Sequence, residues 1–267
     1  MPDQTKYTTK LHASRILVIG GTSGIGYGVA EACVENGAHV VISSSNQSRI
    51  STAVDKLKDA YPSKASSIFG LPVDLSKQDT LEIELEQLFK NTVEKIGGSE
   101  GKLDHVIYTA GDALAPGKIA DLSIEVILKA GQVRFFAPLL VAKFVQRYLV
   151  SSPSSSYIIT TGAVSERPVP NWSTIGSFAG GIHSMVRSLA LDLKPIRVNG
   201  VSPGPTNTEL WVMGEDEKKA MFQALEGKLL TGRVGSVDDL AESYLGLLKD
   251  ENIDGAMIRT DGGGLIV

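Results

Sequence analysis

A glycine-rich turn between a strand and a helix is the feature that most constrains the fold of this chain. Residues 16–19 form a short apolar run with β-branched side chains, which is typical of a strand buried on both faces. Gly20, Gly24 and Gly26 follow it, and a helical pattern then continues to Gly37. This arrangement brings unpaired backbone N–H groups and the positive end of a helix dipole to one point, which suits a pyrophosphate. An ordinary strand-to-helix turn is the alternative, but the flanking elements occur in the order that a phosphate site requires.

The rest of the chain alternates strand and helix patterns without a break in composition, so one domain over residues 1–267 is expected. Further strands are expected at 39–43, 67–73, 103–108, 157–161, 196–201 and 257–260, and further helices at 48–60, 79–96, 123–149, 174–193 and 237–248. The order predicts an α/β, single-domain Rossmann fold: a doubly wound parallel sheet of about seven strands with helices on both faces. A ligand of such a sheet binds at the carboxyl ends of the strands.

The composition limits the classes of partner. The net charge of −4 and the pI near 5.6 argue against nucleic acid, and no apolar run approaches the ~20 residues of a membrane span. The single cysteine, Cys33, is interpreted as a small buried hydrophobe, which fits a reducing compartment. Residues 1–13 read as a polar tail without a signal core, so a cytoplasmic protein is expected. No metal site is expected.

The second strand ends in four small polar residues, Ser43, Ser44, Ser45 and Asn46. An NAD site commonly has an Asp or Glu here, which accepts from the ribose hydroxyls. The four residues present can instead donate hydrogen bonds to a 2′-phosphate, and Arg49 is nearby, so NADP is favoured over NAD. A polar loop without a ligand is the alternative.

Two further strand ends carry candidate cofactor contacts. Asp74 and Leu75 follow the third strand, where a carboxylate can meet the adenine amino group. Thr109, Ala110 and Gly111 follow the fourth, and small residues there let a cofactor ring lie close to the backbone.

Pro138 interrupts the long helical pattern at 123–149. Because proline has no N–H, the carbonyl four residues earlier, that of Arg134, is expected to lose its helical partner. Arg134 is therefore a candidate site residue, although an exposed helix position is the alternative. Farther along, residues 209–230 mix Leu210, Trp211 and Met213 with charges, which predicts a mobile lid over an apolar substrate or a core-facing helix.

Over nearly its whole length the chain resembles the short-chain dehydrogenase/reductase family. The motifs that carry this resemblance are the glycine pattern, Asp74-Leu75, Ala110-Gly111, the segment 187–193, the segment 197–204 and Asp261-Gly-Gly. The resemblance implies a homodimer or homotetramer and places Pro203, Gly204 and the stretch from Thr206 to Thr208 around the nicotinamide carboxamide. The cofactor-binding residues expected from the pattern and the resemblance are Gly20, Thr22, Ser23, Gly24, Ile25, Gly26, Ser43, Ser44, Ser45, Asn46, Asp74, Leu75, Ala110, Gly111, Arg134, Pro203, Gly204, Thr206 and Thr208.

The chain departs from that family where the proton is transferred. Ordinary members use an Asn-Ser-Tyr-Lys tetrad, and counting back from Arg187 puts Ile175 in the Tyr position and Ala179 in the Lys position. Arg134 falls in the Asn position. Thr161 falls in the Ser position, which the alignment fixes to within one residue. Neither Ile175 nor Ala179 can transfer a proton.

The same pattern is similar to a divergent fungal branch of the family that includes NADPH-dependent reductase/Diels–Alderase enzymes of indole alkaloid pathways. That group has a carboxylate at the position of Val169, so cyclase activity is not carried over, and Glu166 is a nearby substitute. The candidate catalytic residues are therefore Arg134, Thr161 and Glu166.

These residues predict an NADP(H)-dependent reductase of a specialised metabolite, acting by hydride transfer to an iminium ion or a similarly activated electrophile. The expected substrate is an apolar or polycyclic small molecule. The alternative is a non-redox protein of the same fold, either an isomerase or cyclase or a cofactor-binding regulator.

Overall fold

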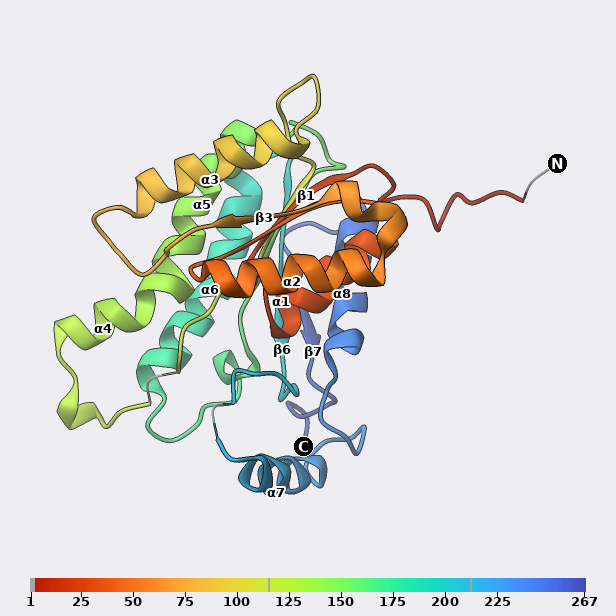
Figure 1. The fold of residues 1–267 in the computed structure, drawn as a ribbon. Coiled ribbons are helices and arrows are strands. Elements are labelled where there is room, and N and C mark those ends of the chain that lie inside the picture. The colour runs from red at the N-terminus through yellow and green to blue at the C-terminus, as the bar shows by residue number, and fades with distance from the viewer. Residues whose placement is uncertain (1–2, 115, 212) are drawn as a thin grey trace.

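The computed structural model describes residues 3–114, 116–211 and 213–267, and these residues form one parallel sheet (Figure 1). Its strand order is β3-β2-β1-β4-β5-β6-β7. The strands are β1 (Arg15–Ile19), β2 (His39–Ser44), β3 (Ile68–Pro72), β4 (His105–Tyr108), β5 (Ser156–Thr160), β6 (Arg197–Pro203) and β7 (Met257–Thr260). The predicted doubly wound sheet of seven strands is confirmed.

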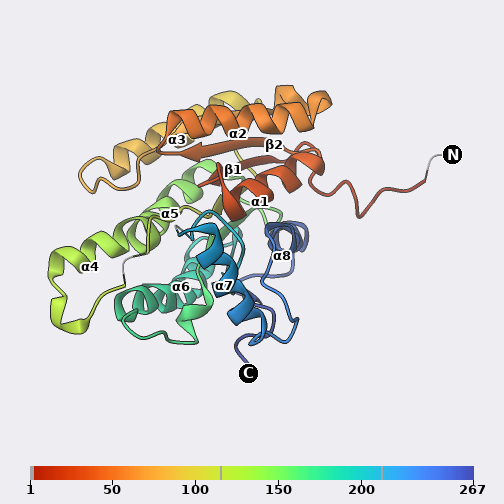
Figure 2. The same ribbon diagram turned by 60° about the horizontal axis from the view of Figure 1, so that its bottom comes forward.

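Helices cover both faces of the sheet (Figures 1 and 2). One face carries α1 (Gly24–Glu35), α2 (Gln47–Ala60) and α8 (Val237–Lys249); the other carries α3 (Leu81–Ile96), α5 (Ala137–Tyr148) and α6 (Ser173–Asp192). Successive residues of β1 point into opposite cores: Leu17 and Ile19 pack with α3 and α5, whereas Ile16 and Val18 pack with α1 and α8. The apolar run at residues 16–19 is therefore buried on both faces of the sheet.

The expected helix at 123–149 is broken into three parts: α4 (Ile124–Gly131), a π-helical turn η3 (Gln132–Phe136) and α5. The N–H of Ala137 donates to the carbonyl of Gln132, five residues earlier. In this π register the missing N–H of Pro138 orphans the carbonyl of Val133, and the hydroxyl of Tyr108 donates to it. The expectation that the carbonyl of Arg134 loses its helical partner assumed an α-helical register; the π-helical turn adds the carbonyl of Val133 to the groups that Pro138 leaves unserved.

The remaining helical segments are short or peripheral. In the part of the chain that the structure describes, three of them are 3₁₀ turns: η1 (Pro62–Ser67), η2 (Ile119–Asp121) and η4 (Ala163–Ser165). The helix α7 (Glu215–Glu226) lies within the segment 209–230 and has no buried residue in the part of the chain described here, so it is not a core-facing helix. Residue 212 of that segment lies outside the described residues. The role of the segment as a substrate lid stays a prediction.

The N-terminal segment is less detached than its polar composition indicates. Leu11 is buried in the core beside α1 and α8, and the ammonium of Lys10 donates to the carbonyl of Lys249 at 2.8 Å. Across the described ranges, no helix combines the length and the apolar character needed to span a bilayer.

Candidate active site at the carboxyl edge of the sheet

The turn after β1 holds the amino end of α1 open to an anion. Gly20 has φ +91°, and a Cβ there would lie 2.5 Å from the backbone nitrogen of Ala110, so only glycine fits. Gly24, Ile25 and Gly26 form the first turn of α1, which contains no acidic residue. Ser23 precedes this turn and makes no side-chain capping bond within the described chain. The free N–H groups and the dipole of α1 therefore remain available to a phosphate.

The polar residues after β2 lie beside a second helix amino end. The hydroxyl of Ser43 is fully buried, since its strand position pairs with buried Ile19 and Leu71, so it does not reach the surface. Ser44 is half-buried, and Ser45 and Asn46 are exposed. The Oδ1 atom of Asn46 accepts from the backbone N–H of Arg49 at 2.9 Å and caps α2.

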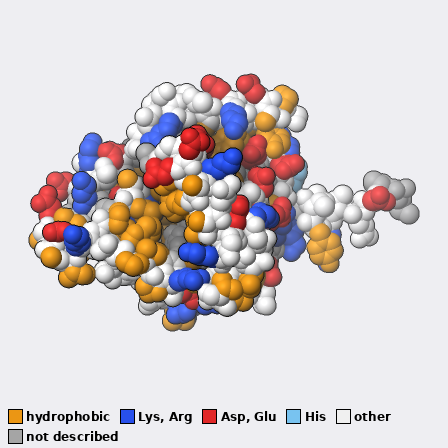
Figure 3. Space-filling view, turned by 90° about the horizontal axis from the view of Figure 1, so that it is seen from below, with side chains coloured by type: hydrophobic (Ala, Val, Ile, Leu, Met, Phe, Trp, Pro, Cys, Tyr) orange, Lys and Arg blue, Asp and Glu red, His pale blue; other side chains and the backbone are white. Residues whose placement is uncertain are grey.

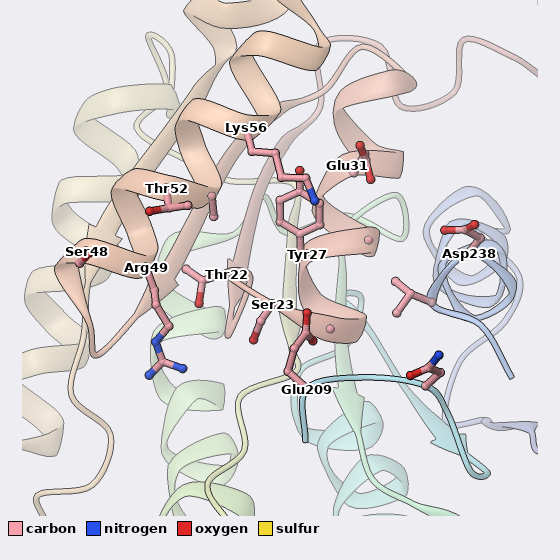
Figure 4. Close-up of a pocket in the computed structure, with 15 residues that line it drawn as sticks. Thr22, Ser23, Tyr27, Glu31, Ser48, Arg49, Thr52, Lys56, Glu209 and Asp238 are labelled. Carbon is pink, nitrogen blue, oxygen red and sulfur yellow. The ribbon is translucent and has the colours of Figure 1, made fainter. Parts of the chain in front are cut away.

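An open cleft of about 400 Å³ lies between α1, α2 and the loop after β6 (Figure 4). Thr22, Ser23 and Arg49 are at one end of it, and Tyr27, Glu31 and Lys56 are at the other (Figure 4). Hydroxyl groups, a guanidinium and two helix amino ends at one end of the cleft suit phosphate groups, although the carboxylate of Glu209 also lies there, beside Ser23 (Figure 4).

Asp74 lies just beyond β3 as an ionised acceptor. Its Oδ1 atom accepts from the backbone N–H of Ser76 at 3.0 Å and from the Ser76 hydroxyl at 2.6 Å. These hydrogen bonds lower the pKa of Asp74, and Lys77 at 3.3 Å adds to the effect. Leu75 is buried, and its carbonyl accepts from the side-chain amide of Gln132 at 3.1 Å, which ties this strand end to the π-helical turn.

Arg134 extends from the π-helical turn to the end of β4. Its Nε donates to the Oδ1 of Asp112 at 3.0 Å, and its Nη2 donates to the backbone carbonyl of Asp112. Three guanidinium atoms lie 2.9 Å from the place where Gly111 would carry a Cβ, so the guanidinium lies against the backbone. Arg134 thus sits beside Ala110 and Gly111, as a cofactor-side residue would. Asp112 was missed, because a carboxylate just after a strand end was its only sign in the sequence.

The other two candidate catalytic residues have their polar groups engaged elsewhere. The hydroxyl of Thr161 donates to the carbonyl of Ala179 in α6 at 2.9 Å. The carboxylate of Glu166 accepts two bonds from Arg259 of β7, one of them 2.9 Å long, and this pairing lowers the pKa of Glu166. Within the described residues, no hydrogen bond joins any two of Arg134, Thr161 and Glu166.

The helix α6 carries none of the tyrosine and lysine side chains that transfer the proton in ordinary family members. Ile175 lies in its first turn and Ala179 in its second, and residues 173–192 include neither tyrosine nor lysine. The nearest titratable side chain of α6 in sequence, His183, is bonded through Nε2 to the hydroxyl of Ser165 at 2.9 Å. Burial lowers the pKa of His183 below its ordinary value, which favours the neutral ring.

The loop after β6 meets the amino end of α1. Pro203 ends β6, Gly204 packs against Asp261, and the Thr206 hydroxyl donates to the carbonyl of Gly204 at 3.0 Å. The side chain of Thr208 lies 3.3 Å from the Cβ position of Gly24. This contact places the loop directly above the phosphate turn. Farther on, the indole of Trp211 donates to the carbonyl of Thr206 at 2.9 Å and meets the Phe222 ring edge-on.

Aromatic side chains line the neighbouring part of this edge. Phe135 and Phe136 of the π-helical turn contact Phe178 of α6, with ring centroids 5.2 and 5.8 Å away. All three rings are half-buried. The view onto this edge shows hydrophobic side chains around a hollow, with cationic side chains at its rim (Figure 3). The surface fits an apolar small molecule next to a charged one.

The comparisons with known proteins agree with this geometry. A family model described as an SDR-like Rossmann domain matches residues 7–267. The short-chain dehydrogenase/reductase fsr5 of Gibberella fujikuroi is 46% identical over 266 residues, covering 98% of each chain. The solved MalC reductase/Diels–Alderase of Malbranchea aurantiaca is 35% identical with a TM-score of 0.91, covering 98% of this chain and 100% of that one.

A solved small-chain dehydrogenase in complex with NADPH is 27% identical with a TM-score of 0.73, covering 95% of this chain and 99% of that one. Sequence, sheet order and phosphate turn lead to the same assignment: the chain belongs to the short-chain dehydrogenase/reductase family.

Proposed function

We propose that this protein is an NADPH-dependent reductase of a specialised metabolite, and that it transfers hydride to an iminium ion or a similarly activated electrophile. The observation that carries the proposal is the contrast between the two halves of the site. The phosphate turn, the α2 amino end and the ends of β3 and β4 have the features of a cofactor site, whereas α6 offers Ile175 and Ala179 where relatives of the usual kind have Tyr and Lys.

NADP(H) is the proposed cofactor. Ser44, Ser45, Asn46 and Arg49 provide donors and a cation at the amino end of α2, whose first turn contains no acidic residue. The neighbour solved with NADPH supports the same choice. When bound, the cofactor supplies the hydride. The turn after β1 and the amino end of α2 would hold its phosphates, Asp74 would meet its adenine, and the loop after β6 would exclude water.

Turnover with stereospecifically deuterated NADPH tests the proposal. The protein is incubated without oxygen with the two C4-deuterated forms of NADPH and a panel of cyclic iminium ions and ketones, and products are analysed by mass spectrometry. We expect label from one of the two forms to reach the product of an iminium substrate. A product that forms without label from either form, or no product from any activated electrophile, would contradict the reductase.

A second, non-redox function is kept as an alternative, although Val169 stands where the Diels–Alderase group has a carboxylate. MalC is named a reductase/Diels–Alderase, and its fold matches this chain over almost the whole length. A non-redox isomerase or cyclase that uses the cofactor as a scaffold is therefore the alternative. A product without label in the same incubation is its expected outcome.

Assembly into a homodimer or homotetramer stays a proposal. The family resemblance supports it, and Leu139 of α5 and Leu191 of α6 are exposed apolar side chains on the helices that the resemblance places in the contact.

A further inference from the structure

The ion pair between Arg134 and Asp112 is held in place by more contacts than an ordinary ion pair on the surface. Asp112 accepts from Arg134 twice, through its side chain and through its backbone carbonyl. The bare Cα of Gly111 makes room for the guanidinium, which lies flat against it. On the other side, the π-helical turn that carries Arg134 is held by the Tyr108 hydroxyl on the carbonyl of Val133. Two separate elements therefore fix the orientation of the pair.

The pair also leaves one anionic atom open. The Arg134 and Asp112 side chains are 28% and 38% exposed, so both are accessible from the carboxyl edge of the sheet. The Oδ1 of Asp112 accepts the hydrogen bond from the Nε of Arg134, and its Oδ2 accepts no hydrogen bond from any residue in the described ranges. This oxygen has lone pairs that are not used in a hydrogen bond, and the charge of the neighbouring Arg134 is already compensated. The oxygen is therefore available to a ligand.

The charges decide which ligand suits this place. An uncompensated Arg134 at the end of β4 would repel a cationic substrate, because like charges at contact distance disfavour each other strongly when partly shielded from water. Asp112 cancels that charge, and its free oxygen adds attraction to a positive centre.

We propose that Asp112 is a specificity-determining residue that selects a cationic substrate over a neutral one of the same shape. The inference rests on the proposed reductase function, because it assigns the charge of the electrophile that the same site accepts. It adds a residue and a charge preference that the candidate catalytic residues do not include.

Binding to the complex of the protein with NADP⁺ tests the inference without turnover. The probes are N-methyl-3,4-dihydroisoquinolinium, a permanent cation, and 1-tetralone, a neutral bicyclic ketone of the same size. Calorimetric titration of the wild type is expected to show tighter binding of the cation. Asp112→Asn is expected to lower the affinity for the cation by about tenfold or more, as for a lost charge-assisted contact. The affinity for the ketone is expected to stay within about twofold of the wild-type value. Asp112→Glu, which keeps the charge, is expected to retain the preference.

Asp121→Asn is the matched control, since it removes the same charge from an exposed carboxylate in the same connection to α4. It is expected to bind both probes like the wild type. Equal affinity of the wild type for cation and ketone would overturn the inference, and so would equal losses for both probes in Asp112→Asn, which would indicate a structural role. Deuteride transfer is measured separately: a preference lost with Asp112→Asn but no label transfer would contradict only the reductase.

Discussion

At the residue scale, the hydrogen-bond partners of a polar side chain determine whether it is available to a ligand. Arg134 was identified from Pro138 and from its alignment, and the structure places its guanidinium against Gly111. By residue type, Ser43 was an equally reasonable candidate for binding the cofactor, and Thr161 and Glu166 were equally reasonable candidates for catalysis. Their polar groups, however, face the interior, Ala179 and Arg259, respectively. Side-chain direction depends on partners far along the chain, and a single sequence does not contain that information.

Removing the Arg134 side chain is expected to weaken the cofactor half of the site. Charge-assisted hydrogen bonds contribute about 1.5–3 kcal/mol, so Arg134→Ala should reduce NADPH affinity or turnover by about tenfold or more. Fluorescence titration of NADPH and steady-state kinetics measure the two effects.

Arg147→Ala is the control for that variant, because Arg147 lies at the far end of α5 and pairs with Glu86 on the surface. It should behave like the wild type. If Arg134→Ala also binds and turns over like the wild type, the guanidinium is only a packing group.

At the element scale, the hydrophobic patterns predicted the strands and most helices, because burial on one or both faces leaves a period in the sequence. The π-helical turn was not predicted, since the same residues are compatible with an α-helix that merely bends at Pro138. What decides between them is the Tyr108 hydroxyl on the carbonyl of Val133, a contact across 25 positions of the chain. Local patterns show that a helix is interrupted, and distant contacts determine how.

The amino end of α2 provides a test of cofactor choice at this scale. Asn46 caps α2 through its side-chain oxygen, and aspartate caps helices equally well, so Asn46→Asp changes the charge without removing the cap. The new carboxylate should repel a 2′-phosphate and accept from a 2′-hydroxyl. The wild type is expected to bind NADPH more tightly than NADH. In the variant, the ratio of the NADPH affinity to the NADH affinity is expected to fall by about tenfold or more.

Isothermal titration with both cofactors measures the change. Ser123→Asp makes a matched control, because Ser123 caps α4 in the same way and the substitution adds the same charge. Equal or reversed affinities of the wild type for the two cofactors would contradict the choice of NADP(H), whatever the variant shows.

At the scale of the whole molecule, the fold followed from the alternation of strands and helices together with the glycine turn, which allow very few topologies. The site could be predicted from the sequence only in part. Its backbone features, the turn and the strand ends, are local and were predicted. Its side-chain partnerships, such as Glu166 with Arg259 across 93 positions, join distant segments and were not.

The chemistry of the whole site predicts which electrophiles are reduced. Hydride addition to a neutral ketone develops an alkoxide that needs a proton, and a positioned acid typically contributes ~10²–10⁴-fold. Ile175 and Ala179 cannot supply that proton, Thr161 donates to a backbone carbonyl, and the lowered pKa of Glu166 makes it a weak donor at neutral pH.

An iminium ion has no need of that proton, because hydride neutralises it directly and correct positioning does most of the work. We therefore expect reduction of cyclic iminium ions and negligible reduction of simple ketones, as measured by NADPH consumption with each class. Ile175→Tyr should leave the iminium activity no higher, since a lone tyrosine without the neighbouring lysine restores no acid for a step that requires none. Efficient reduction of an ordinary ketone, lost on changing Thr161 or Glu166, would instead identify one of these residues as the proton donor that replaces the tyrosine.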